Sequence, residues 1–174
     1  MTMIFLGGVH GVGKTSMCAG VAETFDLRVV AAGAIIRAER HDALSDSRTA
    51  VTNVGGNQDL LVRGVQRLVK DAPGRYLMDG HFALRTLAGN IEEVDAKVFK
   101  AMAVSAFICL FDDPPEIALR LAARDGAVHQ VSRIADLQSA ELRSAGAVAC
   151  TLGLELKVVR AFDFRAFEDC LRQR

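Results

Sequence analysis

The stretch that decides the fold reads Gly8-Val9-His10-Gly11-Val12-Gly13-Lys14-Thr15 and is followed by Ser16. It matches the pattern G-x-x-x-x-G-K-[ST] in full, and the glycines of this pattern let successive backbone N–H groups face phosphate oxygens. The apolar run 3–6 before it predicts a buried strand, and apolar residues at helical spacing over 14–25 predict a helix after it. A phosphate loop between a strand and a helix predicts a site for a nucleoside triphosphate.

Each part of this loop has an expected role in binding ATP and Mg²⁺. The predicted nucleotide-binding residues are Gly8, Gly11, Val12, Gly13, Lys14, Thr15 and Ser16. Lys14 is expected to reach the β- and γ-phosphates, and the Thr15 hydroxyl is a predicted Mg²⁺ ligand. Asp79 ends a later apolar run, where a carboxylate beside the loop predicts a second Mg²⁺ ligand.

Four further strand-like runs follow along the chain, at about 27–31, 75–78, 103–111 and 154–158, and they alternate with helical patterns. This alternation predicts an α/β protein with a five-stranded parallel sheet and helices on both faces, the fold of P-loop NTPases. We expect one domain over residues 1–174. The polar stretch 41–57 predicts a mobile loop, and 82–90 predicts a loop that leads into a weaker helix over 91–102.

Composition gives no sign of nucleic acid or membrane binding. The 21 basic and 21 acidic residues cancel, and no apolar run approaches the length of a membrane span. The cysteines at 18, 109, 150 and 170 lack the spacing of a metal site, which predicts reduced thiols in a cytoplasmic protein. We therefore expect a nucleotide donor and a small-molecule acceptor as partners, and the sequence leaves a homo-oligomer open.

Several arginines are candidates for binding phosphate. Glu116, Arg120 and Arg124 are spaced by four residues and share one face of a helix predicted from Asp113 to Arg124. A solvated ion pair and a pair of arginines over the triphosphate explain that spacing equally well. The residues alone assign no role to Arg37, His81 or Arg85, which lie in a short helix and a loop.

Together with the phosphate loop, three further segments resemble the adenylate kinase superfamily. Residues 32–38 resemble the segment whose Arg binds the acceptor monophosphate, and 79–86 resemble the Asp-Gly-Phe-Pro-Arg-Thr segment. Residues 113–117, Asp-Pro-Pro-Glu-Ile, resemble the helix that leads into the lid. The layout is similar to that of archaeal members over nearly the whole chain, although Ala34 replaces an Asp and Arg85 comes two residues late.

The resemblance implies an ATP-dependent phosphotransferase that phosphorylates a nucleoside monophosphate, with AMP as the default. It implies catalytic roles for Lys14, Arg124 and Arg133, and a place near the donor base for Arg120. The residues expected to bind the acceptor are Arg37, His81 and Arg85. It also implies a mobile acceptor-side region over about 33–72 and a short lid over about 124–133.

Two other functions stay open. The same fold serves kinases of small non-nucleotide hydroxyls, such as shikimate- or gluconate-type kinases, in which Asp79 or His81 would lie near the acceptor hydroxyl. A slow ATPase that acts as a nucleotide-gated regulatory protein is the third hypothesis, because the lid stretch 125–132 carries no Arg.

Overall fold

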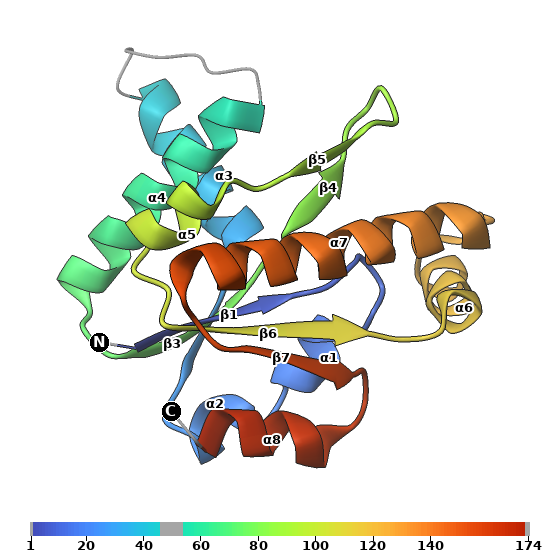
Figure 1. Cartoon of the computed structure of the whole chain (residues 1–174). Coiled ribbons are helices and arrows are strands. Elements are labelled where there is room, and N and C mark those ends of the chain that lie inside the picture. Colours follow the sequence, from blue (N-terminus) through green and yellow to red (C-terminus); the bar gives the residue numbers. More distant parts are fainter. Residues whose placement is uncertain (1, 46–53, 173–174) are drawn as a thin grey trace.

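A five-stranded parallel sheet forms the centre of the protein, with strand order β2-β3-β1-β6-β7. The computed structural model describes residues 2–45 and 54–172. The strands are β1 (Thr2–Gly7), β2 (Arg28–Ala31), β3 (Arg75–Asp79), β6 (Ala106–Phe111) and β7 (Leu156–Arg160). The predicted parallel sheet is confirmed. Because β1 lies in the middle of the sheet, the loop that follows it emerges at the centre of the carboxyl edge (Figure 1).

The central strands are apolar on both faces because both faces are covered. Along β1, Ile4 and Leu6 point into one buried cluster, and Met3 and Phe5 point into another. All four side chains are at most 1% exposed. Full burial of such a side chain contributes about 1.5–3 kcal/mol, so a continuous apolar run is typical of a strand in this position.

Helices cover both faces of the sheet, as the alternating pattern predicts (Figure 1). One face carries α1 (Lys14–Cys18), α2 (Val21–Thr24) and α8 (Phe164–Arg172), and α6 (Pro114–Asp125) adds Ile117 and Leu121 to the same cluster. The other face carries α3 (Ala32–Ser45), α4 (Val54–Asp71), α5 (Ala96–Ala101) and α7 (Val131–Leu152). Within the described part of the chain, no helix combines the length and the apolar character needed to cross a membrane.

The single helix predicted over 14–25 is wrong, because the structure divides it into α1 and α2. Gly20 lies between them with φ of +84°, in the left-handed region that glycine adopts without a Cβ clash. The helical spacing of apolar residues continues across this break, so periodicity alone does not reveal it.

The region 82–102 also differs from its prediction of a loop and a helix. It forms an antiparallel hairpin of β4 (Ala83–Arg85) and β5 (Ile91–Glu93), and α5 begins only at residue 96. The Asp95 carboxylate caps α5 by accepting a hydrogen bond from the Lys97 N–H at 2.9 Å. Each hairpin strand has three residues, which is too short for an alternating pattern to stand out.

The loop predicted over 41–57 is helical at both ends. Helix α3 continues to Ser45 and α4 begins at Val54, and residues 46–53 lie outside the described part of the chain. The two helices approach closely at Gly64, where an added Cβ would lie 2.4 Å from Ile35 Cγ2. The Glu39 carboxylate pairs with the Arg67 guanidinium across the same contact at 2.6 Å. Thus α3 and α4 form one wall beside the carboxyl edge of the sheet.

The cysteines are free thiols, as their spacing predicts. Burial raises the pKa of Cys18 and of Cys109 to about 12, so both stay protonated at neutral pH. They pack in the core as small apolar side chains.

Candidate active site

The phosphate loop turns over the carboxyl end of β1 and leads into α1. Gly8, Gly11 and Gly13 have φ of +139°, +78° and +118°, a region that residues with a Cβ rarely adopt. An added Cβ would also lie 2.6 Å from Leu121 Cγ at Gly11 and 2.9 Å from Phe162 Cζ at Gly13. Backbone conformation and packing therefore both require the glycines of the motif.

Lys14 lies inside the loop and is only 7% exposed. Its ammonium donates hydrogen bonds to the carbonyl oxygens of Gly8 and of Val9, the latter at 3.3 Å. It also pairs with Asp79 Oδ1 from the end of β3 at 3.7 Å. Burial lowers the pKa of Lys14 below its ordinary value, and the nearby Asp79 carboxylate opposes this shift. The sequence prediction that Asp79 lies beside the loop is confirmed.

A buried carboxylate that the sequence analysis missed supports the loop from behind. Glu141 of α7 is 1% exposed, and its Oε1 accepts a hydrogen bond from the Gly8 N–H at 2.8 Å. Its Oε2 accepts another from the Ala83 N–H at 2.5 Å, and Oε1 lies 3.7 Å from His81 Nδ1. Glu141 therefore links the phosphate loop, the start of β4 and His81. Its spacing from the buried Ala145 of the same helix is the one signal that could have found it.

His10 lies at the mouth of the site with its ring against His81. The ring centroids are 4.3 Å apart and the planes are tilted by 52°. Partial burial removes water from the His10 ring and lowers its pKa to about 4. Repulsion from the positive charges of His81, Lys14 and Arg124 adds to this shift. His10 is therefore neutral at physiological pH.

This shift predicts proton uptake when a nucleotide binds. Phosphate charge beside His10 would offset the repulsion and raise the pKa from about 4 toward its ordinary 6.5, so His10 gains a proton between those two values. Calorimetric titration with ADP at about pH 5.5, in buffers of different ionisation enthalpy, should show uptake in the wild type that exceeds the uptake in His10→Gln. At about pH 8 the two proteins should agree. Equal uptake by both at the lower pH would contradict this expectation.

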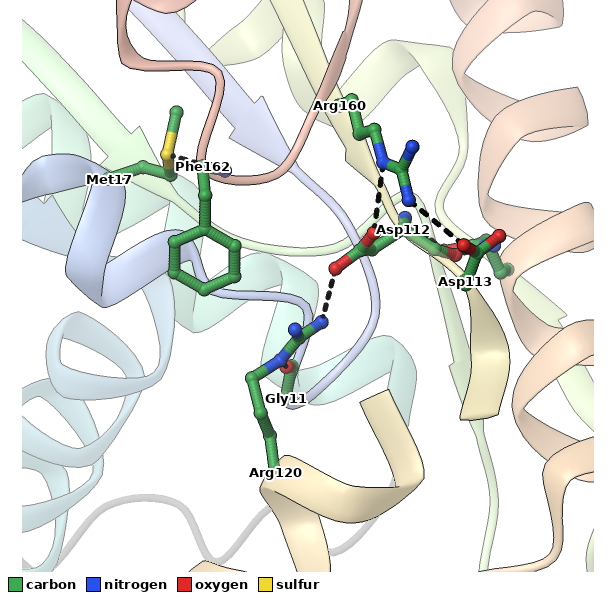
Figure 2. Close-up of polar contacts among 8 residues, drawn as sticks. Gly11, Met17, Asp112, Asp113, Arg120, Arg160 and Phe162 are labelled. Carbon is green, nitrogen blue, oxygen red and sulfur yellow. Dashed lines mark hydrogen bonds and ion pairs between the residues drawn. The ribbon is translucent and has the colours of Figure 1, made fainter. Parts of the chain in front are cut away.

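Arg120 of α6 reaches the outer side of the phosphate loop (Figure 2). Its Nε donates to the Gly11 carbonyl at 3.0 Å, and its Cζ lies 5.0 Å from the centroid of the Phe162 ring. Phe162 has φ of +68°, and its N–H donates to Met17 Sδ at 3.1 Å. The Arg120 and Phe162 side chains thus lie together beside the phosphate loop.

Asp112 at the end of β6 fixes Arg120. Its Oδ2 accepts from Arg120 Nη2 at 2.7 Å, and its Oδ1 accepts from Arg160 Nε at 3.2 Å (Figure 2). Burial alone would raise the pKa of Asp112, but these hydrogen bonds and the Asp113 N–H keep it below its ordinary value. Arg160 Nη2 also donates to the Asp113 carboxylate at 2.9 Å. Arg160 and Phe162 were missed, and only their position at the end of the last strand and just after it could have indicated them.

One cavity of about 610 Å³ brings most of the predicted residues together. It is lined at one end by Gly11, Gly13, Lys14, Thr15, Ser16, Arg120 and Arg124, and further in by Asp79 and His81. The other end is walled by α3, α4, the hairpin and α5. Arg37 lies beside the rim, with Nη1 3.5 Å from where a Cβ on the lining residue Gly33 would stand.

Arg85 and Arg133 do not line this cavity but a second one of about 320 Å³, which meets the first at Val9, His10 and Leu121. Arg85 donates to the carbonyl oxygens of Gly89 at 2.7 Å and of Arg133 at 3.2 Å. Successive side chains of a strand point to opposite faces, so Leu84 of β4 faces the main cavity and Arg85 faces away from it. The stretch 124–133, predicted as a lid, comprises the turn at 126–130 and the adjoining ends of α6 and α7, and its role as a lid stays a prediction.

The oxygen atoms in the main cavity fit a bound Mg²⁺. Thr15 offers a hydroxyl and Asp79 offers a carboxylate, and Mg²⁺ prefers a few such oxygens together with substrate phosphates. Over residues 2–45 and 54–172 there is no group of three or more His, Cys, Asp or Glu side chains that would hold a metal by itself.

The fold and this site define a P-loop enzyme of the kinase-like class. A family model described as an AAA domain, AAA_17, matches residues 7–138, and the chain belongs to this family. Among curated proteins, none matches the sequence. The solved structures compared with this chain below include a gluconokinase and a shikimate kinase, and the more specific resemblance to adenylate kinases stays a prediction.

Three solved structures with the same fold carry the names of small-molecule kinases. The chain aligns with a gluconokinase from Sinorhizobium meliloti 1021 (TM-score 0.56, 99% of this chain and 92% of that one). It also aligns with a sugar kinase from Janibacter sp. HTCC2649 (TM-score 0.61, 99% and 93%) and a shikimate kinase from Bacteroides thetaiotaomicron (TM-score 0.57, 99% and 95%). Identity is 16% in each case, so these similarities establish the fold alone.

Proposed function

We propose that the protein transfers the γ-phosphoryl group of ATP to a hydroxyl group of a small non-nucleotide molecule. The observation that carries this proposal is the cavity of about 610 Å³, which is lined by Lys14 and Thr15 at one end and by α3, α4, α5 and the β4–β5 hairpin at the other. A kinase needs donor and acceptor in line within one water-excluding site, and this cavity offers both positions.

The basic side chains would stabilise the charge that develops on the transferring group. We assign Lys14 to the β- and γ-phosphates and Arg124, which lines the same cavity, to the γ-phosphate. Thr15 and Asp79 would hold Mg²⁺, which when bound neutralises phosphate charge. Arg133 lines the second cavity. We propose that it reaches the phosphates when the stretch 124–133 closes over them.

The acceptor hydroxyl is proposed to lie between the two ends of the cavity, at Asp79 and His81. The Asp79 carboxylate is 24% exposed and therefore accessible to a ligand. His81 Nδ1 faces Glu141, which holds the ring in place. Asp79 would accept the hydroxyl proton as the acceptor attacks, and His81 would position the hydroxyl.

A nucleoside monophosphate, with AMP as the default, is the second candidate acceptor. The position of Arg37 beside the cavity rim favours it. The Arg85 side chain, the other predicted phosphate ligand, faces the second cavity instead. The structural neighbours named for gluconate, sugar and shikimate further support a non-nucleotide acceptor.

Formation of ADP from Mg-ATP, measured with single acceptors, tests the proposal. The panel contains gluconate, shikimate, simple alcohols, AMP, CMP, UMP, GMP and dTMP. Stimulation by a non-nucleotide hydroxyl supports the proposal, and stimulation by one monophosphate alone would replace it with the second candidate. Slow ADP formation that is indifferent to every acceptor would favour the nucleotide-gated regulatory protein.

Arg120→Ala should weaken ATP binding without weakening acceptor binding. Arg120 contacts the loop and the Phe162 ring at the donor end, and loss of a cation–π and charge-assisted contact corresponds to about a tenfold higher KM for ATP. The KM for the acceptor should stay unchanged in steady-state kinetics. Arg143→Ala, which removes an exposed arginine of α7, is the matched control and should behave like the wild type. An unchanged KM for ATP in Arg120→Ala would remove Arg120 from the donor site.

Two further expectations belong with this proposal. A cytoplasmic location agrees with the free thiols, and the partners would be the nucleotide donor and the small-molecule acceptor. The oligomeric state stays open, as the sequence leaves it.

A further inference from the structure

The acceptor end of the cavity has apolar walls. They are built by Ile36 of α3, Leu61 of α4, Leu84 of β4, Val94 between β5 and α5, Val98 and Phe99 of α5, and Met102 just after α5. These side chains come from segments spread over about 65 residues of sequence, since the first is at 36 and the last at 102. The apolar surface is therefore a product of the tertiary fold and is not one exposed stripe of a helix.

The wall is held in a fixed shape by aromatic packing. The Phe99 ring lies 4.9 Å from that of Phe5 and 5.3 Å from that of Phe82, measured between centroids. Phe5 and Phe82 are themselves 5.0 Å apart, in an edge-to-face arrangement. Interdigitated aromatic rings resist repacking, so the space beside them is a preformed site.

Charged groups lie at the opposite end. Lys14, Arg120 and Arg124 line the donor side of the cavity, and among the described lining residues of the acceptor end only Asn57 and Gln58 have polar side chains. If the acceptor carried a carboxylate or a phosphate, this anion would lie against apolar side chains at the wall. If the acceptor were a polyol, several of its hydroxyl groups would have no hydrogen-bond partner there. Arg37 lies at the rim beside Gly33 and is not among these lining side chains, so the wall itself disfavours phosphates, carboxylates and polyols.

Asn57 is oriented by a neighbour. Its Oδ1 accepts a hydrogen bond from Arg40 Nη2 at 2.5 Å. This contact uses the carbonyl of the amide and leaves the NH₂ group as the donor that Asn57 can offer to a ligand. One hydrogen-bond acceptor on an otherwise apolar molecule would satisfy it.

We propose that the acceptor is an alcohol with a predominantly apolar body, such as a ring or branched hydrocarbon, and one hydrogen-bond acceptor group that faces Asn57. This inference rests on the proposed function. In the reaction, a bond forms between the hydroxyl oxygen and the γ-phosphorus, and the bond from that phosphorus to the β–γ bridging oxygen breaks. ADP leaves with the electron pair of the broken bond, and the hydroxyl proton passes to Asp79 and then to solvent.

Variants of the apolar wall test this inference. ADP formation from Mg-ATP is measured with 3-(4-methoxyphenyl)propan-1-ol and (4-methoxycyclohexyl)methanol, whose ether oxygen can accept a hydrogen bond from Asn57, and in parallel with AMP, gluconate and shikimate. The apolar alcohols should stimulate ADP formation, and Leu84→Gln should raise their KM roughly tenfold while the KM for ATP stays unchanged. The matched control is Leu87→Gln, because Leu87 lies in the same hairpin but is fully exposed and does not line the cavity.

A second variant guards against a folding defect in the first. Val94→Thr, nearly isosteric, adds one hydroxyl to the same wall and should raise the KM for the alcohols several-fold in the same direction. If gluconate or shikimate stimulates turnover and the apolar alcohols do not, the apolar acceptor is wrong and the proposed kinase function stands. If AMP alone stimulates turnover, a nucleoside monophosphate is the acceptor, and the proposed function and this inference are both wrong. If neither set stimulates turnover, the proposed function fails and this inference fails with it.

Discussion

Lys14→Ala lowers the kcat for ATP turnover by about 10³-fold or more, which corresponds to about 4 kcal/mol of transition-state stabilisation. The ammonium is the buried positive charge inside the phosphate loop, and its bonds to Gly8 and Val9 hold it where the phosphates enter. Alanine can supply neither the charge nor these contacts. Acceptor-dependent ADP formation with the purified variant measures the loss.

Lys70→Ala is the control for this variant, because it removes an exposed lysine on α4 and should turn over ATP like the wild type. Thermal unfolding of both variants separates a catalytic loss from a folding defect. Retention of kcat within about tenfold in a folded Lys14→Ala protein would remove Lys14 from the mechanism.

Glu141→Ala should lower the free energy of unfolding by about 3 kcal/mol, because it leaves the buried N–H groups of Gly8 and Ala83 without an acceptor. It should also lower kcat, since the phosphate loop and His81 lose the carboxylate that they share. Urea unfolding gives the stability change, and steady-state kinetics on the folded fraction gives the change in kcat.

Two other variants make the interpretation specific. Glu141→Gln keeps a carbonyl oxygen for one of the two N–H groups, so its loss of stability should fall between those of the wild type and Glu141→Ala. Glu92→Ala removes an exposed carboxylate from β5 and should change stability by about 0.5 kcal/mol or less. If Glu141→Ala unfolds like Glu92→Ala, the buried carboxylate is not the support that its contacts indicate.

The sheet could be predicted because its strands are buried on both faces. Runs such as Met3–Leu6 and Ala106–Phe111 are continuously apolar for that reason, and their order along the chain fixes a parallel sheet. The β4–β5 hairpin could not be predicted, since three residues on each side give no periodicity and its position depends on the contacts of Phe82 and Val94. The break at Gly20 depends on one backbone torsion angle.

The phosphate loop could be predicted because its glycines, Lys14 and Thr15 all lie in one short stretch of sequence. Glu141 lies 133 residues from Gly8, and Phe162 lies in the turn that follows β7. Only the tertiary fold brings these two side chains to the loop. Arg85 was predicted as an acceptor ligand because it lies in a segment that resembles a family motif. The resemblance does not show which way the side chain points, and β4 directs it away from the main cavity. The alternation of Leu84 and Arg85 along that strand decides which of them can meet an acceptor.

Transfer of label from ATP carrying radioactive phosphorus at the γ position is the most direct test of phosphoryl transfer within one shared cavity. The reaction is run with each acceptor in turn, and the organic product is separated from inorganic phosphate. We expect label in the organic product, dependent on the acceptor and lost in Lys14→Ala, with little release of inorganic phosphate. Label found only in inorganic phosphate, at a rate that no acceptor changes, would contradict phosphoryl transfer and identify the protein as an ATPase.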